Sequence, residues 1–198
     1  MNGPTTPDAG DSFWRTGAEA PVDAPYVGIP LGEDLARALR AGAEGSYPAE
    51  AATELLIRHG RWLARARFVQ ECVYALDDRA DMLAVDWRAV QAYVGAAPGT
   101  PAERAIALVA VQLGGYPDPA EAPIDLQGMP PLAWLLVNLE RDDVDLVLAA
   151  ISHAAGTQDH VDHLGELTAA GEWQPTSTSP RLRLGPLHAW PEPALRGL

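Results

Sequence analysis

The chain has 198 residues, 47% of them hydrophobic, and this length is sufficient for one domain with a well-packed core. It has 27 acidic residues and 14 basic ones, all arginine, which gives a formal net charge of −13. The absence of lysine from the sequence excludes a P-loop, a Schiff-base lysine and a Ser–Lys dyad, and the negative charge argues against nucleic acid as a partner.

The two ends of the chain are rich in proline and also carry aromatic residues. Residues 1–30 contain five prolines and Trp14, and residues 172–198 contain five prolines and Trp190. Proline lacks an amide donor and restricts the residue before it, so neither segment favours a helix. We therefore expect an N-terminal arm over residues 1–30 and a C-terminal arm over residues 172–198, flanking a helical domain over residues 31–171.

The first half of that domain shows helical spacing of its apolar residues. A helix is predicted over Glu33–Ala41, with Gly42 as a left-handed cap. Spacings of three and four predict a long helix from Pro48 to about Asp77, which Gly60 would kink or split. A short helix over Trp87–Val94, capped by Asp86 and closed by Gly95, follows.

The second half of the domain opens on the clearest local signal in the chain. Thr100, Pro101 and Glu103 form the pattern of a capping box, which predicts a helix over Pro101–Leu113. Three further helices are expected, at Pro131–Leu139, from an Asp142 cap to Ala155, and from Thr157 or Gln158 to Ala170. No strand is predicted. The expected fold is all-α, an irregular multi-helix bundle with extended proline-rich arms.

Two segments of the second half resemble a known group of sequences. They are RAIALVAVQLGG, which starts at Arg104, and the stretch from Pro123 to Gly156 with PIDLQG and LVNLERDDVDLVLAAISHAAG. Both are similar to uncharacterised actinobacterial helical proteins. The resemblance, over about residues 104–156, implies an actinobacterial source and a helical fold, and it transfers no site.

Cysteine content and hydropathy indicate a compartment. With the single cysteine Cys72, no intramolecular disulfide is possible. Residues 1–11 lack the basic start and apolar run of a secretory signal. The longest apolar stretches, 105–111 and 130–137, fall short of the ~20 residues that a membrane-spanning helix requires. We therefore expect a cytoplasmic protein without membrane contact.

Histidines and carboxylates gather near the end of the domain. On the expected last helix, spacings of four and three place Asp159, His163 and Glu166 on one side, with His160 and the preceding His153 nearby. Imidazole and carboxylate ligands together suit zinc, iron or manganese. One interpretation is a divalent-metal site in a metal-binding protein or metal-dependent enzyme; the other is a solvated polar face.

Two further features allow a functional and a structural interpretation. Arg58, Arg61 and Arg65 share one stripe of the expected long helix and could bind a phosphate or a carboxylate-rich partner, but Glu54 is also placed to pair with Arg58. Cys72 lies on the apolar stripe of that helix, where burial raises a thiol pKa and leaves it unreactive.

The negative charge is concentrated in one half of the chain. Residues 105–180 carry eleven acidic residues and one arginine, and Asp142, Asp143 and Asp145 lie close together on one helix. We therefore expect a non-catalytic interaction protein (an adaptor, an inhibitor or immunity-like protein, or an assembly component) that uses this acidic face, Trp14 and Trp190 to bind a basic protein. The arms also offer a route to a homo-oligomer. No catalytic residue or cofactor is assigned.

Overall fold

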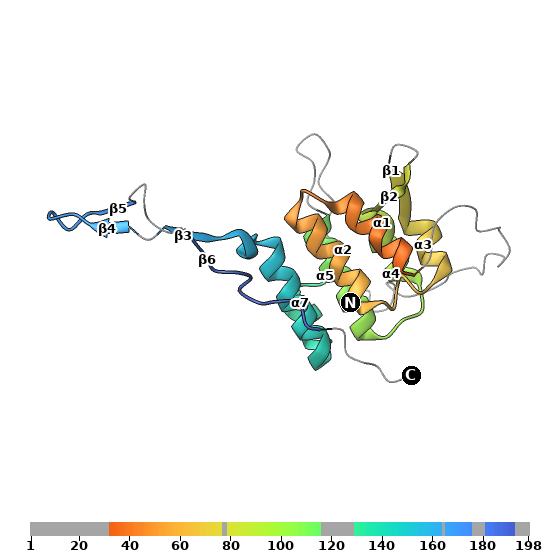
Figure 1. The fold of residues 1–198 in the computed structure, drawn as a ribbon. Helices are drawn as coiled ribbons and strands as arrows, with labels where there is room; N and C mark the ends of the chain where they lie inside the picture. The colour runs from red at the N-terminus through yellow and green to blue at the C-terminus, as the bar shows by residue number, and fades with distance from the viewer. Residues whose placement is uncertain (1–31, 77–78, 116–128, 164, 176–180, 193–198) are drawn as a thin grey trace, which may run out of the picture.

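The computed structural model describes residues 32–76, 79–115, 129–163, 165–175 and 181–192. Within these ranges the chain forms seven α-helices, one short 3-10 helix and three two-stranded antiparallel sheets (Figure 1). The fold is therefore mainly α-helical, as expected, but its strands depart from the all-α prediction. The N-terminal arm, including Trp14, lies outside the described residues.

Helices α2 (Tyr47–His59) and α5 (Pro101–Gly114) form the centre of the fold. Both helices are deeply buried, and five of their alanines have no exposed surface: Ala51, Ala52, Ala105, Ala107 and Ala110. Gly114 lies at the contact between them, because a Cβ atom there would lie 2.4 Å from Trp87 and 2.7 Å from the Ala52 Cβ. Small residues at the contact let the two backbones approach closely.

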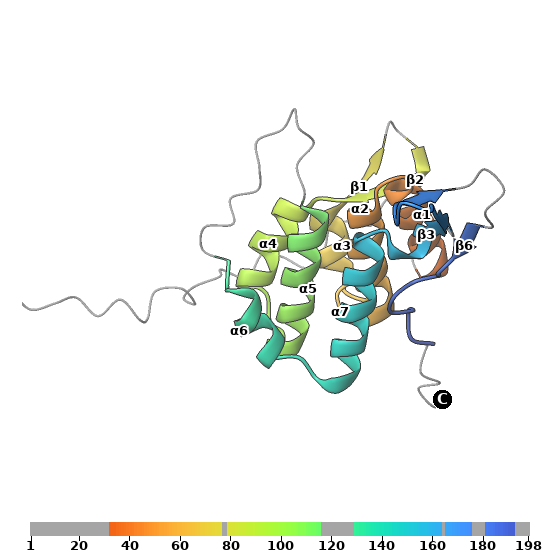
Figure 2. The ribbon, with the colours of Figure 1, turned by 90° about the vertical axis from the view of Figure 1, so that its left-hand side faces the viewer.

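Four helices surround this central pair. Helix α7 (Arg141–Ala154) packs on α2 and α5, whereas α4 (Trp87–Ala96) and α6 (Leu132–Val137) pack on α5. Figure 2 shows α4, α5 and α7 side by side, with α6 close to α5. Helix α1 (Glu33–Ala43) covers α2 and the strand β2 (Arg79–Val85).

Two of the predicted N-terminal caps are confirmed, those of α5 and α4. The Thr100 hydroxyl accepts from the Glu103 amide at 3.1 Å, and the Glu103 carboxylate accepts from the Thr100 amide at 3.0 Å. Asp86 accepts from the amides of Arg88 and Ala89, both at 3.0 Å. The start of α7 differs from the prediction, because Glu140 and not Asp142 is its N-cap residue.

The long helix predicted from Pro48 to about Asp77, with a kink or split at Gly60, is split at that glycine. Helix α2 ends at His59, and Gly60 follows with a φ of 72° and an amide that donates to the Leu56 carbonyl. The turn sends Trp62 into the core, where its Nε1 donates to the Glu103 carbonyl at 2.7 Å. Its ring packs against Phe68, at the start of helix α3 (Ala66–Cys72), and against Tyr93.

After α3 two strands pair in antiparallel fashion, and the first of them lies where helix was expected. Strand β1 (Val73–Leu76) pairs with β2 (Arg79–Val85), with Val73 opposite Val85. Val73 is β-branched and buried, and this favours a packed strand over a continued helix. The same sheet places Leu83 under α1.

The prediction of a last helix to Ala170 is wrong. After the 3-10 helix η1 (Thr157–Asp159), strand β3 (Val161–His163) pairs with β6 (Arg181–Arg183), and β4 (Gly165–Leu167) pairs with β5 (Trp173–Pro175). Together they form a ribbon that extends away from the helices in Figure 1. The expected boundary at residues 171 and 172 falls in the turn between β4 and β5. The alternation of arginine and leucine at 181–183 is typical of a strand.

Gly42 has a different role from the predicted helix cap. Helix α1 continues through it to Ala43, so no left-handed conformation is required there. A Cβ atom at Gly42 would lie 2.0 Å from the carbonyl oxygen of Leu83. Glycine at this position therefore permits the contact between α1 and β2.

We predict that Gly42→Ala destabilises the protein by about 2 kcal/mol or more, because the new methyl group collides with rigid backbone. Gly95→Ala is the matched control, since its Cβ would meet no atom within 4 Å and alanine favours α4. Urea unfolding followed by circular dichroism gives both free energies. Equal stabilities of the two variants would contradict the proposed role of Gly42.

Candidate functional site

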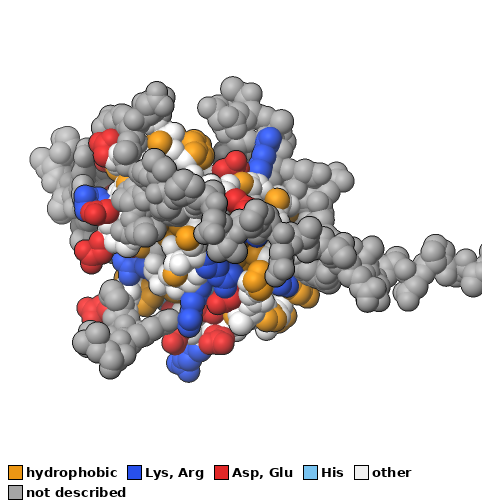
Figure 3. Space-filling model, turned by 90° about the vertical axis from the view of Figure 1, so that its right-hand side faces the viewer, with side chains coloured by type: hydrophobic (Ala, Val, Ile, Leu, Met, Phe, Trp, Pro, Cys, Tyr) orange, Lys and Arg blue, Asp and Glu red, His pale blue; other side chains and the backbone are white. Residues whose placement is uncertain are grey.

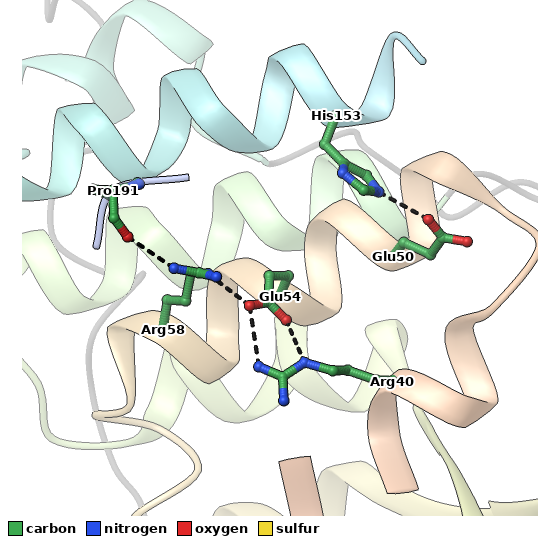
Figure 4. A network of polar contacts seen from close by, with 6 residues as sticks. All are labelled: Arg40, Glu50, Glu54, Arg58, His153 and Pro191. Carbon is green, nitrogen blue, oxygen red and sulfur yellow. Dashed lines mark hydrogen bonds and ion pairs between the residues drawn. The ribbon is translucent and has the colours of Figure 1, made fainter. Parts of the chain in front are cut away.

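A cavity of about 430 Å³ lies between α1, α2, α7 and the C-terminal segment. Its carboxylates and its arginine come from α1, α2 and their connection, His153 comes from α7, and its apolar wall combines alanines of α1 with one indole ring. The lining residues are Arg40, Ala41, Ala43, Glu44, Glu50, Glu54, His153 and Trp190. Figure 4 shows the polar contacts among several of them.

Glu54 is the centre of an ion-pair network beside this cavity. Its carboxylate accepts from Arg40 Nε and Nη2 at 2.7 and 3.1 Å, and from Arg58 Nε at 2.6 Å (Figure 4). Burial disfavours the charged carboxylate, but the two guanidinium groups outweigh burial and lower the pKa of Glu54. The Glu54–Arg58 pair that four-residue spacing predicted is therefore confirmed.

Glu50 is held in a second set of contacts one helical turn away. His153 Nε2 lies 2.8 Å from one of its carboxylate oxygens, and the Gly45 amide donates to the other, also at 2.8 Å. Both side chains are partly buried. Close by, the Tyr47 hydroxyl donates to Asp159. These contacts tie α2 to the end of α7 and to η1.

Residues 184–192, which we call the C-terminal strap, lie across α7 and α2. The Leu187 amide donates to the Thr157 hydroxyl at 3.1 Å, and the His188 amide donates to the Ser152 hydroxyl at 2.9 Å. Arg58 Nη1 donates to the Pro191 carbonyl at 2.8 Å, and its guanidinium lies 5.2 Å from the centre of the Trp190 ring. Trp190, predicted as a partner-binding residue, is thus packed on its own chain.

Helix α7 presents a row of exposed apolar side chains on the side away from α2. Val144, Leu148 and Ile151 are 36%, 44% and 42% exposed, at spacings of four and three residues. Helix α6 adds four more exposed apolar side chains: Leu132, Trp134, Leu136 and Val137. Both helices face the viewer in Figure 2. We call these seven residues, with the exposed Asp142 and Asp145, the outer face.

The three predicted partner-binding aspartates of α7 do not point the same way. Asp142 and Asp145 are exposed, whereas the Asp143 side chain is 14% exposed and lies 4.0 Å from the buried His59 imidazole. Asp143 therefore faces the body. Figure 3 shows the molecule from the direction opposite to Figure 2, and there acidic and basic side chains lie next to one another.

Sequence reasoning did not identify the apolar half of the outer face. Helix α7 carries apolar residues on two sides, because Val147 and Ala150 are buried while Val144, Leu148 and Ile151 are exposed. A helix that is apolar on more than one side signals burial or an interface. That excess of apolar positions was the available signal.

The predicted metal ligands do not lie on one helix. His153 contacts Glu50, Asp159 contacts Tyr47, and His160 is exposed. The side chains of His163 and Glu166 lie outside the described residues, and their backbones belong to β3 and β4. Among the residues that the structure describes, no group of three or more His, Cys, Asp or Glu could hold a metal. The metal site stays a prediction.

The predicted arginine row is not formed, because α2 ends before Arg61. Arg58 contacts Glu54 and the strap, whereas Arg65 donates to the Pro98 carbonyl at 2.6 Å and to the Glu103 carboxylate at 2.9 Å. The Arg65 guanidinium also lies 4.1 Å from the centre of the Trp62 ring. Arg61 is exposed. Two of the three arginines therefore hold the fold together.

The comparisons with known proteins give no relative. No family model matches the chain, and neither a curated protein nor a solved structure matches it. In the part of the chain that the structure describes, no helix is long and apolar enough to cross a membrane.

We predict that Glu54→Gln lowers the free energy of unfolding by about 1–3 kcal/mol near pH 7, because two guanidinium groups lose their carboxylate. Since the pKa of Glu54 is lower in the folded protein, ionised Glu54 stabilises above its ordinary pKa. This contribution is lost as the pH falls through the folded-state pKa. Urea unfolding at about pH 7 and about pH 3 should therefore show a difference between wild type and variant that shrinks in acid.

Glu71→Gln is the control for this experiment. It breaks the exposed Arg67–Glu71 pair of the same four-residue spacing, and we expect a change of about 0.5 kcal/mol or less. A Glu54 variant that behaves like the Glu71 variant at both pH values would overturn the assigned role of Glu54.

Cys72 should be unreactive in the folded protein. Its side chain is buried, and burial, followed by the nearby Glu71 and Asp86 charges, raises the pKa of the thiol to about 12. We expect a thiol reagent such as DTNB to modify the native protein only at the rate of unfolding, and the urea-unfolded protein rapidly. Rapid modification of native protein would contradict this assignment.

Proposed function

We propose that this is a non-catalytic interaction protein that binds a basic partner protein through the outer face of α6 and α7. The observation that carries the proposal is the exposed row of Val144, Leu148 and Ile151 on α7. A row at these spacings matches the apolar stripe of a partner helix, which would cover it on binding.

Exposed acidic residues on the same helix support a basic partner. Glu140, Asp142 and Asp145 are exposed, and Arg141 is the basic residue among them. Carboxylates at the rim of an apolar contact steer a cationic partner and oppose an anionic one. An amphipathic helix with apolar residues on one side and arginine or lysine along its edges fits both halves of the surface. The aromatic Trp134 of α6 is 44% exposed and suits an anchoring contact.

The proposed surface is compatible with three cellular roles. An adaptor, an inhibitor or immunity-like protein, and an assembly component would each use one such surface, and we place this activity in the cytoplasm. The proline-rich arms would extend the contact or join copies of the chain. The exposed Leu184 and Leu187 of the strap offer apolar surface for that purpose.

We predict that a photo-crosslinking amino acid at position 148 captures a basic protein in the native host. The control carries the same amino acid at position 37, an exposed residue of α1 away from the outer face. Mass spectrometry identifies the adduct. Equal adducts at both positions, or an adduct with a second copy of the chain, would overturn the proposal of a basic partner.

The captured protein should then bind the purified chain directly. We expect Leu148→Ser with Ile151→Ser to weaken that affinity by about a hundredfold, because two buried apolar contacts are lost. Asp142→Asn with Asp145→Asn should mainly slow association and reduce its dependence on salt. Unchanged affinity of the serine variant would place the interface elsewhere.

A further inference from the structure

We propose that the cavity lined by Glu44, Glu50 and Trp190 is a binding site for an alkylammonium group. The inference does not depend on the outer face, because the cavity lies between α1, α2 and the strap. A volume of about 430 Å³ is within the range of small-ligand sites in proteins.

The charge of the cavity favours a cation. Three carboxylates line it, but both nearby guanidinium groups, Arg40 and Arg58, are engaged with Glu54. Glu54 is therefore compensated, with one guanidinium charge in excess. The three carboxylates and two guanidinium groups together leave one net negative charge when His153 is counted as neutral, and the carboxylates without a guanidinium contact are Glu50 and the exposed Glu44.

The apolar part of the lining favours an alkylammonium group over a planar cation. Ala41 and Ala43 come from α1, and the Trp190 indole closes the cavity from the strap. One side of the Trp190 ring is already covered by the Arg58 guanidinium, so stacking of a second planar cation on that side is blocked. A flexible aliphatic chain can instead lie against the alanines and the indole, while its ammonium group donates to Glu44 and Glu50.

The same chemistry can come from a free amine or from a lysine side chain of another protein. Both present an ammonium group on a short methylene chain, and the cavity contacts only that part. The two sources differ in what is attached to the methylene chain. A lysine residue also carries peptide groups, which must remain outside the cavity. Separate probes therefore distinguish them.

The test uses the full chain with n-hexylamine as the probe and n-hexanol as its uncharged analogue. We expect hexylamine to bind at about millimolar concentration and to shift the amide resonances of Gly45 and His153 and the Trp190 indole resonance in NMR spectra. Hexanol should bind at least about tenfold more weakly. Equal binding of the two, or no saturable shift at these positions with either, would overturn the proposal.

Matched variants locate the site. Glu44→Gln should weaken hexylamine binding by about three- to fivefold, because it removes one exposed carboxylate, whereas Glu33→Gln at the far end of α1 should change it less than twofold. Trp190→Leu provides a second variant that removes the indole wall and should weaken binding by about fivefold. If neither Glu44→Gln nor Trp190→Leu differs from Glu33→Gln, the cavity is not the site.

A further binding measurement uses N-acetyl-lysine amide as the probe. Binding comparable to that of hexylamine indicates that the cavity accepts a lysine side chain, and selective binding of hexylamine indicates a free amine. Both results support the alkylammonium site. The outer-face variants Leu148→Ser and Ile151→Ser should leave hexylamine binding unchanged, so failure of this proposal and failure of the interaction proposal are separable.

Discussion

The close approach of α2 and α5 is the constraint on which the rest of the structure depends. Alanines on both helices are fully buried, and Gly114 lies where any side chain would collide with Trp87 and Ala52. Larger residues at the contact would separate the helices, and the surfaces that receive α1, α4 and α7 would move apart.

The second fixed point is Trp62, which joins three parts of the chain. Its ring packs against Phe68 and Tyr93, and its Nε1 donates to the carbonyl of Glu103 in the first turn of α5. Glu103 also completes the capping box and accepts from Arg65. The start of α5, the turn after α2 and the aromatic cluster are therefore held by one shared set of contacts.

Helix α7 separates the two surfaces for which functions are proposed. Its side toward α2 carries His153 and contributes to the cavity, whereas its opposite side carries Val144, Leu148 and Ile151. The strap contacts the first side through the Ser152 hydroxyl and Arg58 and leaves the second side exposed. Because α2 and the strap lie on one side of α7 only, this helix has buried polar contacts on that side and an exposed apolar row on the other.

The sequence by itself determined the features that depend on neighbouring residues. The Thr100–Glu103 capping box, the Asp86 cap and the Glu54–Arg58 pair each join groups within four residues, so residue type and spacing were sufficient to predict them. The concentration of acidic residues in 105–180 and the helical class were also predictable, because composition and periodicity extend over many residues.

Only the tertiary structure decided where periodic segments stop and which way their side chains face. The sequence left open whether Gly60 kinks or splits the predicted helix, and the burial of Trp62 against Glu103 and Tyr93 favours the split. Asp143 turns toward His59 while its neighbours stay exposed, and Trp190 packs on Arg58, which is 132 positions earlier in the chain. Such contacts join residues distant in sequence, and local propensity is weak compared with the free energy of their burial.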